Sequence, residues 1–157
     1  MHLASRQGLR WLLLATITVV ADQASKAWVA KTLPLYHRIE LLPVLNLAHM
    51  HNTGIAFSML RSAPPIAFVM LSVGVSIALA FWLLRHPPAQ RLVAAGLSLI
   101  LGGAVGNAID RARLGYVVDF IDFHIHNWHF ATFNIADSAI TIGAGLLLLD
   151  MLLGVGD

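Results

Sequence analysis

The sequence contains no cysteine, so disulfide frameworks, thiolate zinc sites and cysteine nucleophiles are excluded. Charged residues are scarce as well, since they make up 11% of the chain, against about 25% in ordinary soluble domains. The formal net charge is only +2, and the ten lysines and arginines are scattered along the chain. Because no basic stripe is present for a phosphate backbone to bind, we expect no nucleic-acid partner.

Hydrophobic residues are abundant instead, at 58% of the chain, and the mean hydropathy is +0.76. The length of 157 residues fits one domain. A water-soluble globule of this size could not bury so much apolar surface, and a disordered chain would be far more polar. We therefore interpret residues 1–157 as a single integral membrane domain.

Four apolar stretches are long enough to cross a bilayer, which takes about 20 helical residues. They are approximately residues 9–29, 66–84, 92–109 and 136–155. The first stretch continues into a helical segment that carries Asp22 and Lys26, so we expect it to be retained rather than cleaved as a signal peptide. Gly102 and Gly106 form a small-xxx-small pair, which permits close helix packing. The fold class is thus an all-α membrane protein with four transmembrane helices.

The two linkers on one face of the membrane each contain residues that predict local structure. The first, residues 32–61, mixes short alternating apolar runs with Pro34, Pro43 and a turn signal that begins at Asn52. We expect it to form a small β-rich cradle at the level of the headgroups. The second, residues 113–134, contains Tyr116, Trp128 and several phenylalanines, which are typical of a membrane interface. We expect this interfacial linker to be a mobile cover.

Most acidic residues gather at the same face. With four spans, six of the eight acids lie there, and several of them stand within apolar sequence where a charge is costly. They are Asp22, Glu40, Asp110, Asp119, Asp122 and Asp137. We therefore place the functional site at this face.

Two carboxylates held together in a partly dry site cannot both ionise easily, so the pair shares a proton. One member can then take a proton from water while the other donates a proton to a carbonyl oxygen, as in an aspartic peptidase. Asp137, at the entry of the last span, is one candidate. The residues alone do not choose between Asp119 and Asp110 as its partner.

Local structural roles also fit several of these residues. Asn134 stands three residues before Asp137, as an N-cap residue does before an acid in the first turn. Asp22 and Lys26 are four residues apart, so a salt bridge at the end of a helix is expected.

Asn107, Asp110 and Arg111 share a helical face, and we expect Asp110 to form a structural ion pair with Arg111. Asp122, three residues after Asp119, is expected to be solvated.

Other catalytic classes have less support. The eight histidines include His49, His51, His124, His126 and His129, but no H-E-x-x-H motif or compact set of three ligands occurs. We interpret these histidines as interfacial side chains of exposed linkers and expect no metal. No G-x-S-x-G motif is present, and neither Ser58 nor Ser138 has an assignable base.

Five motifs, in order, carry a resemblance to a known family. They are Asp22-Gln-Ala-Ser-Lys26, Asn52-Thr-Gly-Ile-Ala-Phe57, Gly106-Asn-Ala-Ile-Asp-Arg111, Val117-Val-Asp-Phe120 and Phe133-Asn-Ile-Ala-Asp137. Over nearly its whole length, the chain resembles bacterial lipoprotein signal peptidases, also called type II signal peptidases. These are membrane aspartic peptidases that remove the signal peptide of a prolipoprotein before its diacylglyceryl-modified cysteine.

The resemblance implies roles for individual residues. It implies that Asp119 and Asp137 are the catalytic dyad, with a water held between them. It implies that Asp22 and Lys26 are structural. It also implies substrate-positioning or supporting roles for Asn52, Gly54, Asn107, Asp110, Arg111 and Asn134. No cofactor or metal is implied.

The resemblance further implies a bacterial inner-membrane protein with both termini in the cytoplasm and a globomycin-sensitive site at the periplasmic side. The expected partners are diacylglyceryl-prolipoproteins and membrane lipid, and a monomer is expected. Two other function classes remain as alternatives, a small proton-coupled carrier and a noncatalytic assembly factor. A carrier would need acids near the midplane of several helices, along a path that reaches both faces.

Overall fold

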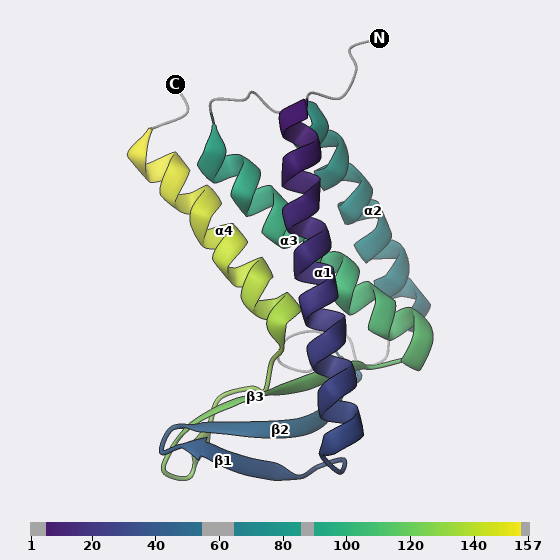
Figure 1. Cartoon of the computed structure of the whole chain (residues 1–157), viewed down its shortest axis with the longest axis vertical. Coiled ribbons are helices and arrows are strands. Elements are labelled where there is room, and N and C mark those ends of the chain that lie inside the picture. The colour runs from purple at the N-terminus through teal and green to yellow at the C-terminus, as the bar shows by residue number, and fades with distance from the viewer. Residues whose placement is uncertain (1–5, 55–64, 86–89, 155–157) are drawn as a thin grey trace.

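The computed structural model describes residues 6–54, 65–85 and 90–154. These residues form four helices and four strands, with the four helices packed side by side and the sheet across one end of them (Figure 1). In chain order the elements are α1 (Arg6–Thr32), β1 (Arg38–Leu42), β2 (Leu45–Asn52), α2 (Pro65–Arg85), α3 (Arg91–Leu114), β3 (Val117–Ile125), β4 (Trp128–His129) and α4 (Ile135–Leu153).

The four expected spans coincide with the four helices. Three are apolar and long enough to cross a membrane, namely Gly8–Thr32, Arg91–Leu114 and Ile135–Leu153, and α2 contributes the shorter apolar helix Val69–Arg85 among the described residues. The prediction of an all-α membrane fold with a small sheet is confirmed. Three of the expected spans end within three residues of the helix ends, but α3 runs five residues beyond the expected end at residue 109.

The longer α3 has a local cause. Its polar last turns remain helical because Asp110 is buried rather than exposed at a helix end. The helix ends at Gly115, whose φ of 80° lies in the left-handed region and whose N–H donates to the carbonyl of Arg111. Glycine adopts this conformation without strain, so it terminates the helix.

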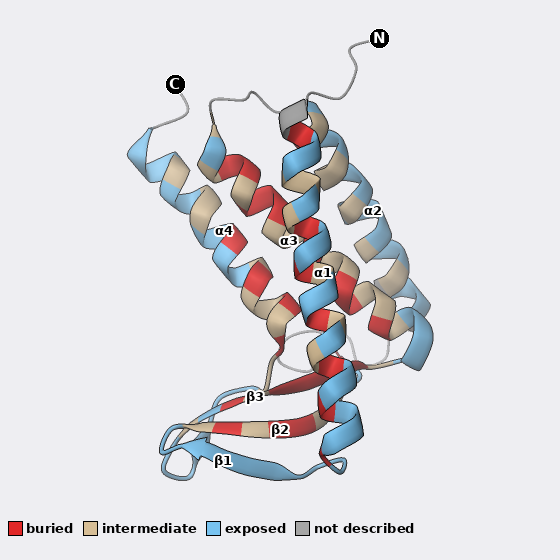
Figure 2. Cartoon of the chain, viewed as in Figure 1, coloured by how far each residue is buried: buried red, intermediate tan, exposed pale blue. Residues whose placement is uncertain are grey.

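Burial differs sharply among the helices. The apolar window of α3 is 61% buried, whereas that of α4 is 17% buried, and α3 packs against each of the other three helices. Figure 2 shows exposed residues along the outer faces of α1, α2 and α4. Because these outward side chains are largely leucine, isoleucine, valine and methionine, they suit contact with lipid rather than water.

Glycines allow the close packing of α3. A Cβ atom on Gly102 would lie 2.6 Å from Cβ of Thr18, and one on Gly106 would lie 2.6 Å from Oδ2 of Asp22. The expected close packing at these two glycines therefore occurs, against α1. On its other side, α3 meets α4 where Gly96 faces Gly143.

The sheet is antiparallel throughout, with the strand order β1-β2-β3-β4. Strands in the first linker are confirmed as β1 and β2. The second linker, for which a mobile cover was expected, supplies β3, which pairs with β2 from Leu45–Phe123 to Asn52–Val117. An unpaired edge of β2 would expose its backbone donors and acceptors, and β3 satisfies them.

Two apolar clusters lie on either side of a polar layer. One, deep in the bundle, consists of Ala15, Leu83, Val93, Ala94, Leu97 and Leu101. The other joins the end of α1 to the sheet through Val29, Leu33 and Phe120. The polar layer between them contains the buried Asp22, Lys26, Asn107, Asp110, Asp119 and Asn134.

Candidate active site

The polar layer brings together two acids from different elements. Asp119 lies on β3 and is 2% exposed. Asp137 is the third residue of α4, in the turn that Asn134 caps. Asn134 Oδ1 accepts a hydrogen bond from the backbone N–H of Asp137 at 2.9 Å, and Asn134 Nδ2 donates to Asp119 Oδ1 at 2.7 Å. One side chain thus connects both acids, and the predicted N-cap is confirmed.

A second asparagine contacts the other oxygen of Asp119. Asn52, at the end of β2, donates through Nδ2 to Asp119 Oδ2 at 2.9 Å. The oxygen of the same amide accepts from the backbone N–H of Gly54 at 3.0 Å. Because a backbone N–H can only donate, the Asn52 oxygen must face Gly54, and its NH₂ group must face the carboxylate.

A third asparagine contacts Asp137. Asn107 on α3 donates through Nδ2 to Asp137 Oδ1 at 2.8 Å. Asn107 Oδ1 accepts from the ammonium of Lys26 at 3.0 Å and from Nδ2 of Asn134 at 3.3 Å. Asp119 thus accepts from two amide NH₂ groups and Asp137 from one, and a donor at the opposite end of each amide fixes its orientation.

Lys26 lies at the centre of the layer, only 3% exposed. Its ammonium lies 2.8 Å from Asp22 Oδ2 and 3.1 Å from Asp110 Oδ2. The expected Asp22–Lys26 pair is confirmed, although it is buried rather than at an exposed helix end. Asp22 Oδ1 also accepts from the backbone N–H of Ala136 at 2.9 Å, so this pair ties α1 to the start of α4.

Gln23 belongs to this layer but was not singled out from the sequence. Its Nε2 lies within hydrogen-bond distance of Asp110 Oδ1 at 2.9 Å, and of Asp22 Oδ2 and the carbonyl of Gly106 at 3.2 Å. Only its position beside Asp22 in the first motif could have pointed to it, because a glutamine in an apolar helix needs a partner.

Asp110 and Arg111 have separate partners. The Asp110 carboxylate accepts from the backbone N–H of Val118 at 3.1 Å, in addition to Gln23 and the ion pair with Lys26. The sequence predicts an ion pair between Asp110 and Arg111. In the structure the ion-pair partner of Asp110 is Lys26. Arg111 donates through Nη2 to the carbonyl of Gly54 at 3.2 Å.

Burial raises the pKa of Asp119 from 3.8 to about 7. The value of about 7 is the net result, in which burial and the negative charge of Asp137 raise the pKa, whereas the hydrogen bonds from Asn52 and Asn134 and the charge of Lys26 lower it. Asp119 is therefore largely protonated below neutral pH. The charge of Asp137 thus acts on Asp119 as a nearby like charge does, since it disfavours the ionised form.

A second polar cluster lies farther along the sheet. Asp122 was expected to be solvated, but it is fully buried. Its Oδ2 accepts from Asn46 Nδ2 and from Arg38 Nε, each at 3.0 Å, and His129 Nδ1 lies 3.0 Å from its Oδ1. Burial acts to raise the pKa of Asp122, but the hydrogen bonds from Asn46 and His129 and the charge of Arg38 lower it overall. The expectation failed because β3 pairs with β2, which covers Asp122.

The histidines differ in how far they are buried. His126 and His129 are exposed, as expected for the linkers, but His49 is buried, with its Nδ1 2.8 Å from the carbonyl of Leu33. His51 stacks on Tyr116 with the ring centroids 3.6 Å apart. Within the described ranges, no group of three or more His, Asp or Glu side chains is arranged to hold a metal ion.

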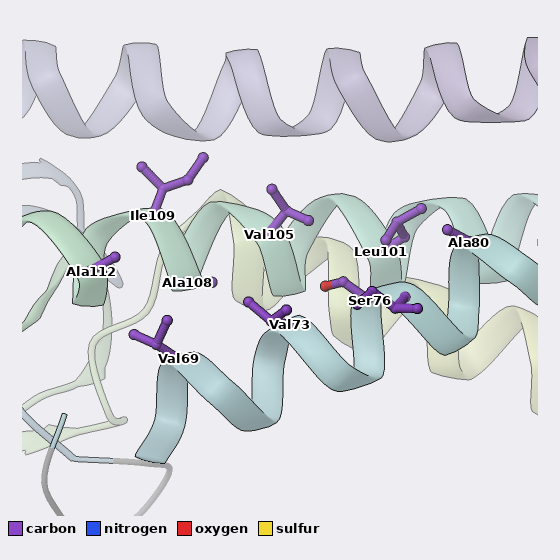
Figure 3. Close-up of a pocket in the computed structure, with 10 residues that line it drawn as sticks. Val69, Val73, Ser76, Ala80, Leu101, Val105, Ala108, Ile109 and Ala112 are labelled. Carbon is purple, nitrogen blue, oxygen red and sulfur yellow. The ribbon is translucent and has the colours of Figure 1, made fainter. Parts of the chain in front are cut away.

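A groove of about 460 Å³ lies between α2 and α3 (Figure 3). Its lining is apolar except for Ser76 and includes Val69, Val73, Ile77, Ala80, Leu101, Val105, Ala108, Ile109 and Ala112. Ile109 and Ala112 flank Asp110 and Arg111 in the chain, so the groove reaches the level of the polar layer. Residues 55–57 of the second motif and Ser58 lie outside the described residues.

The chain is similar in sequence to known proteins. Residues 14–153 match the family model described as "Signal peptidase (SPase) II". A lipoprotein signal peptidase of Coxiella burnetii (strain Dugway 5J108-111) is 48% identical over 152 residues, which cover 95% of this chain and 93% of the relative. One from Shewanella pealeana is 46% identical over 146 residues, or 91% of this chain and 86% of the relative.

Solved structures show the same architecture. A bacterial membrane enzyme determined at 2.3 Å resolution superposes with a TM-score of 0.84 and is 33% identical, over 94% of this chain and 90% of that one. A second bacterial membrane enzyme, at 1.9 Å, gives a TM-score of 0.81 and 35% identity, over 91% and 92% of the two chains.

Proposed function

This chain belongs to the signal peptidase II family, and from that premise we propose which of its residues carry out the reaction. It is an aspartic peptidase that cleaves the signal peptides of prolipoproteins, and a multi-pass protein of a bacterial cytoplasmic membrane. This membership excludes the carrier and the assembly factor as alternatives.

We propose Asp119 and Asp137 as the catalytic dyad. The observation that carries the proposal is the bridge through Asn134, which contacts the carboxylate of Asp119 and caps the backbone of Asp137. Asp110 is the weaker partner for Asp137 because its carboxylate is held in an ion pair with Lys26 and by Gln23 and the backbone of Val118, whereas the side chains that donate to Asp119 are neutral amides. Its contacts support a structural role.

The two acids have different environments, which supports different roles. Asp119 is the member that holds a proton, in keeping with its pKa of about 7. Asp137 stands in the first turn of α4, where the positive end of the helix dipole stabilises a negative charge. We propose that Asp137 is the general base and Asp119 the general acid.

The proposed reaction begins with a water held between the two carboxyl groups. Asp137 takes a proton from this water as its oxygen attacks the scissile carbonyl carbon, and Asp119 gives its proton to the carbonyl oxygen. When the tetrahedral intermediate collapses, the C–N bond breaks and the proton on Asp137 passes to the leaving amine. Asp119 regains its proton from the collapsing intermediate, so the dyad is restored.

The α2–α3 groove supports a lipid-bearing substrate. Its apolar lining suits an acyl chain, and it reaches the level of Asp110 and Arg111. A substrate anchored in the bilayer by a diacylglyceryl group would present its peptide at this depth. We propose cleavage immediately before the lipid-modified cysteine, with Asn52, Gly54 and Arg111 as candidate residues that position the peptide.

We propose that the site faces the periplasm and that both ends of the chain lie in the cytoplasm. The start of α1 and the end of α4 lie at the same end of the bundle, opposite the sheet (Figure 1), which supports this arrangement. Because both acids and their amide partners come from one chain, we propose that the protein acts as a monomer.

The test is a gel-shift cleavage assay in detergent or lipid with a diacylglyceryl-modified prolipoprotein. We expect wild type to cleave with or without a chelator, and Asp119→Asn and Asp137→Asn to lose cleavage although they remain folded. Glu40→Gln, at an exposed position on β1, is the control and should cleave normally. Loss with Asp110→Asn but normal cleavage with Asp119→Asn would move the dyad to Asp110 and Asp137.

A further inference from the structure

We propose that Lys26 is a positioning residue for the dyad, because its ammonium holds the amide of Asn107 in the orientation that directs Nδ2 toward Asp137. The inference rests on the proposed function of Asp119 and Asp137. It gives Lys26 a part in the reaction that a salt bridge between helical residues would not have.

The ammonium of Lys26 has three N–H donors and no acceptor. All three donors have a partner, since Asp22 Oδ2, Asn107 Oδ1 and Asp110 Oδ2 lie 2.8, 3.0 and 3.1 Å from Nζ. The side chain is 3% exposed, so water does not substitute for these partners. The bond to Asn107 is the one that leads toward the dyad.

The amide of Asn107 is held between a group that only donates and a group that accepts. Its oxygen faces the ammonium of Lys26, and its NH₂ group faces Asp137 Oδ1 at 2.8 Å. A rotation by 180° would put the NH₂ group against the ammonium and the carbonyl oxygen against the carboxylate. Lys26 therefore fixes which end of Asn107 meets Asp137.

The same oxygen links Lys26 to the other acid. Asn107 Oδ1 also accepts from Nδ2 of Asn134 at 3.3 Å, and that NH₂ group donates to Asp119 at 2.7 Å. A flipped Asn107 would present an NH₂ group to the NH₂ group of Asn134. Loss of Lys26 is thus expected to disturb the hydrogen bonds to both carboxylates.

The decisive experiment is a double-mutant cycle between Lys26→Met and Asn107→Ala, with cleavage of a diacylglyceryl-prolipoprotein measured against pH. We expect Lys26→Met to lower kcat by roughly 10- to 100-fold, the effect of one hydrogen bond to a charged group, with little change in KM. We also expect the alkaline limb of the kcat/KM profile, which reports Asp119, to move to higher pH, because the charge of Lys26 and the hydrogen bond from Asn134 both lower the pKa of that group. In the Asn107→Ala background, Lys26→Met should lower kcat no further, and only the direct effect of the Lys26 charge on the pKa of Asp119 should remain.

Removal of Lys26 alone leaves Asp22 and Asp110 without their shared cation, which can prevent folding. The variant Asp22→Asn/Lys26→Met keeps the net charge of this buried group and is compared with Asp22→Asn alone, at equal amounts of folded protein. The pH shift should occur in the double variant and be absent from Asp22→Asn, which retains the bond between Lys26 and Asn107.

Multiplicative effects of Lys26→Met and Asn107→Ala, or the same pH profile for Asp22→Asn and Asp22→Asn/Lys26→Met, would overturn the positioning role and leave Lys26 purely structural. Failure of the proposed function looks different. In that case wild type does not cleave, or Asp119→Asn and Asp137→Asn cleave normally.

Discussion

Asn134 donates a 2.7 Å hydrogen bond to Asp119 with one end of its amide and caps the helix that carries Asp137 with the other. The helix start and the acid pair therefore depend on one side chain that is fully buried. Substitution can separate the two roles of Asn134, because the cap needs only a side-chain oxygen, whereas the bond to Asp119 needs an NH₂ donor.

Substitutions at Asn134 should separate these two roles. Asn134→Ala is expected to lower the free energy of unfolding by about 1 kcal/mol through loss of the cap, and to lower cleavage strongly. Asn134→Ser keeps a capping oxygen but loses the NH₂ donor, so it should retain more of the wild-type Tm while cleavage remains low. Thermal unfolding and cleavage rates measured on the same preparations check this. Equal losses of Tm in the two variants would show that Asn134 is not mainly a cap.

The raised pKa of Asp119 should limit activity at alkaline pH. If Asp119 must be protonated to act as general acid, kcat/KM should fall tenfold per pH unit above about pH 7, the pKa of this group. A pH profile of cleavage with lipidated substrate checks this. A profile that stays flat up to pH 9 would contradict the role of Asp119 as the proton donor.

The same shift predicts how stability depends on pH. The folded state binds the Asp119 proton more tightly than the unfolded chain, in which the pKa is about 4. The contribution of Asp119 to stability is thus fully present below about pH 4 and is lost as the pH rises through about 7. Asp119→Asn should remove this part of the slope of Tm against pH, and an unchanged slope would argue against the raised pKa.

The contact between α3 and α4 should not tolerate an added methyl group. A Cβ atom on Gly143 would lie 2.6 Å from the carbonyl oxygen of Gly96, so Gly143→Ala is expected to destabilise the bundle by about 1–3 kcal/mol. Gly145→Ala, two residues further along α4, meets nothing within 4 Å and should leave stability unchanged or slightly higher. Unfolding in detergent measures both variants, and equal Tm values would contradict the close approach.

Asp122 should stabilise the sheet. Asp122→Asn is expected to lower the free energy of unfolding by about 1–3 kcal/mol, since buried donors lose a charged acceptor. Because the pKa of Asp122 is lowered, its contribution should be present above about pH 4 and be lost as the pH falls through the lowered value. Urea titrations at pH 7 and at pH 3 measure both effects. Glu40→Gln, on the exposed β1, is the control, and a loss as large as that of Asp122→Asn would contradict this role.

The helices were predictable from the sequence because a bilayer requires about 20 apolar residues, and this requirement is readable from composition. The end of α3 could not be predicted in this way. A charged residue such as Asp110 is typical of the end of a span, and only its partners on α1 and β3 show that it is buried within the helix. Local spacing was also sufficient for the Asn134 cap and for the Asp22–Lys26 pair, which lie within one helical turn.

Contacts between segments that are far apart in the chain could not be predicted from local sequence patterns. The pairing of β2 with β3 helps to bury Asp122, and local sequence does not reveal this pairing, so Asp122 was expected to be solvated. Likewise, Lys26 reaches Asp110 and Asn107 only because α1 and α3 approach at Gly106. The motif set, rather than any spacing rule, selected Asp119 over Asp110.

The bond from the backbone of Ala136 to Asp22 spans 114 residues and joins the first helix to the last. During synthesis, α1 leaves the ribosome long before α4, so Asp22 cannot accept the hydrogen bond from Ala136 until α4 has been made. Asp137 itself belongs to α4, and Asp119 obtains a cross-strand neighbour only after the α2–α3 hairpin has been inserted. With the proposed dyad of Asp119 and Asp137, the nascent chain has no complete site until α4 has been made and has packed against α1.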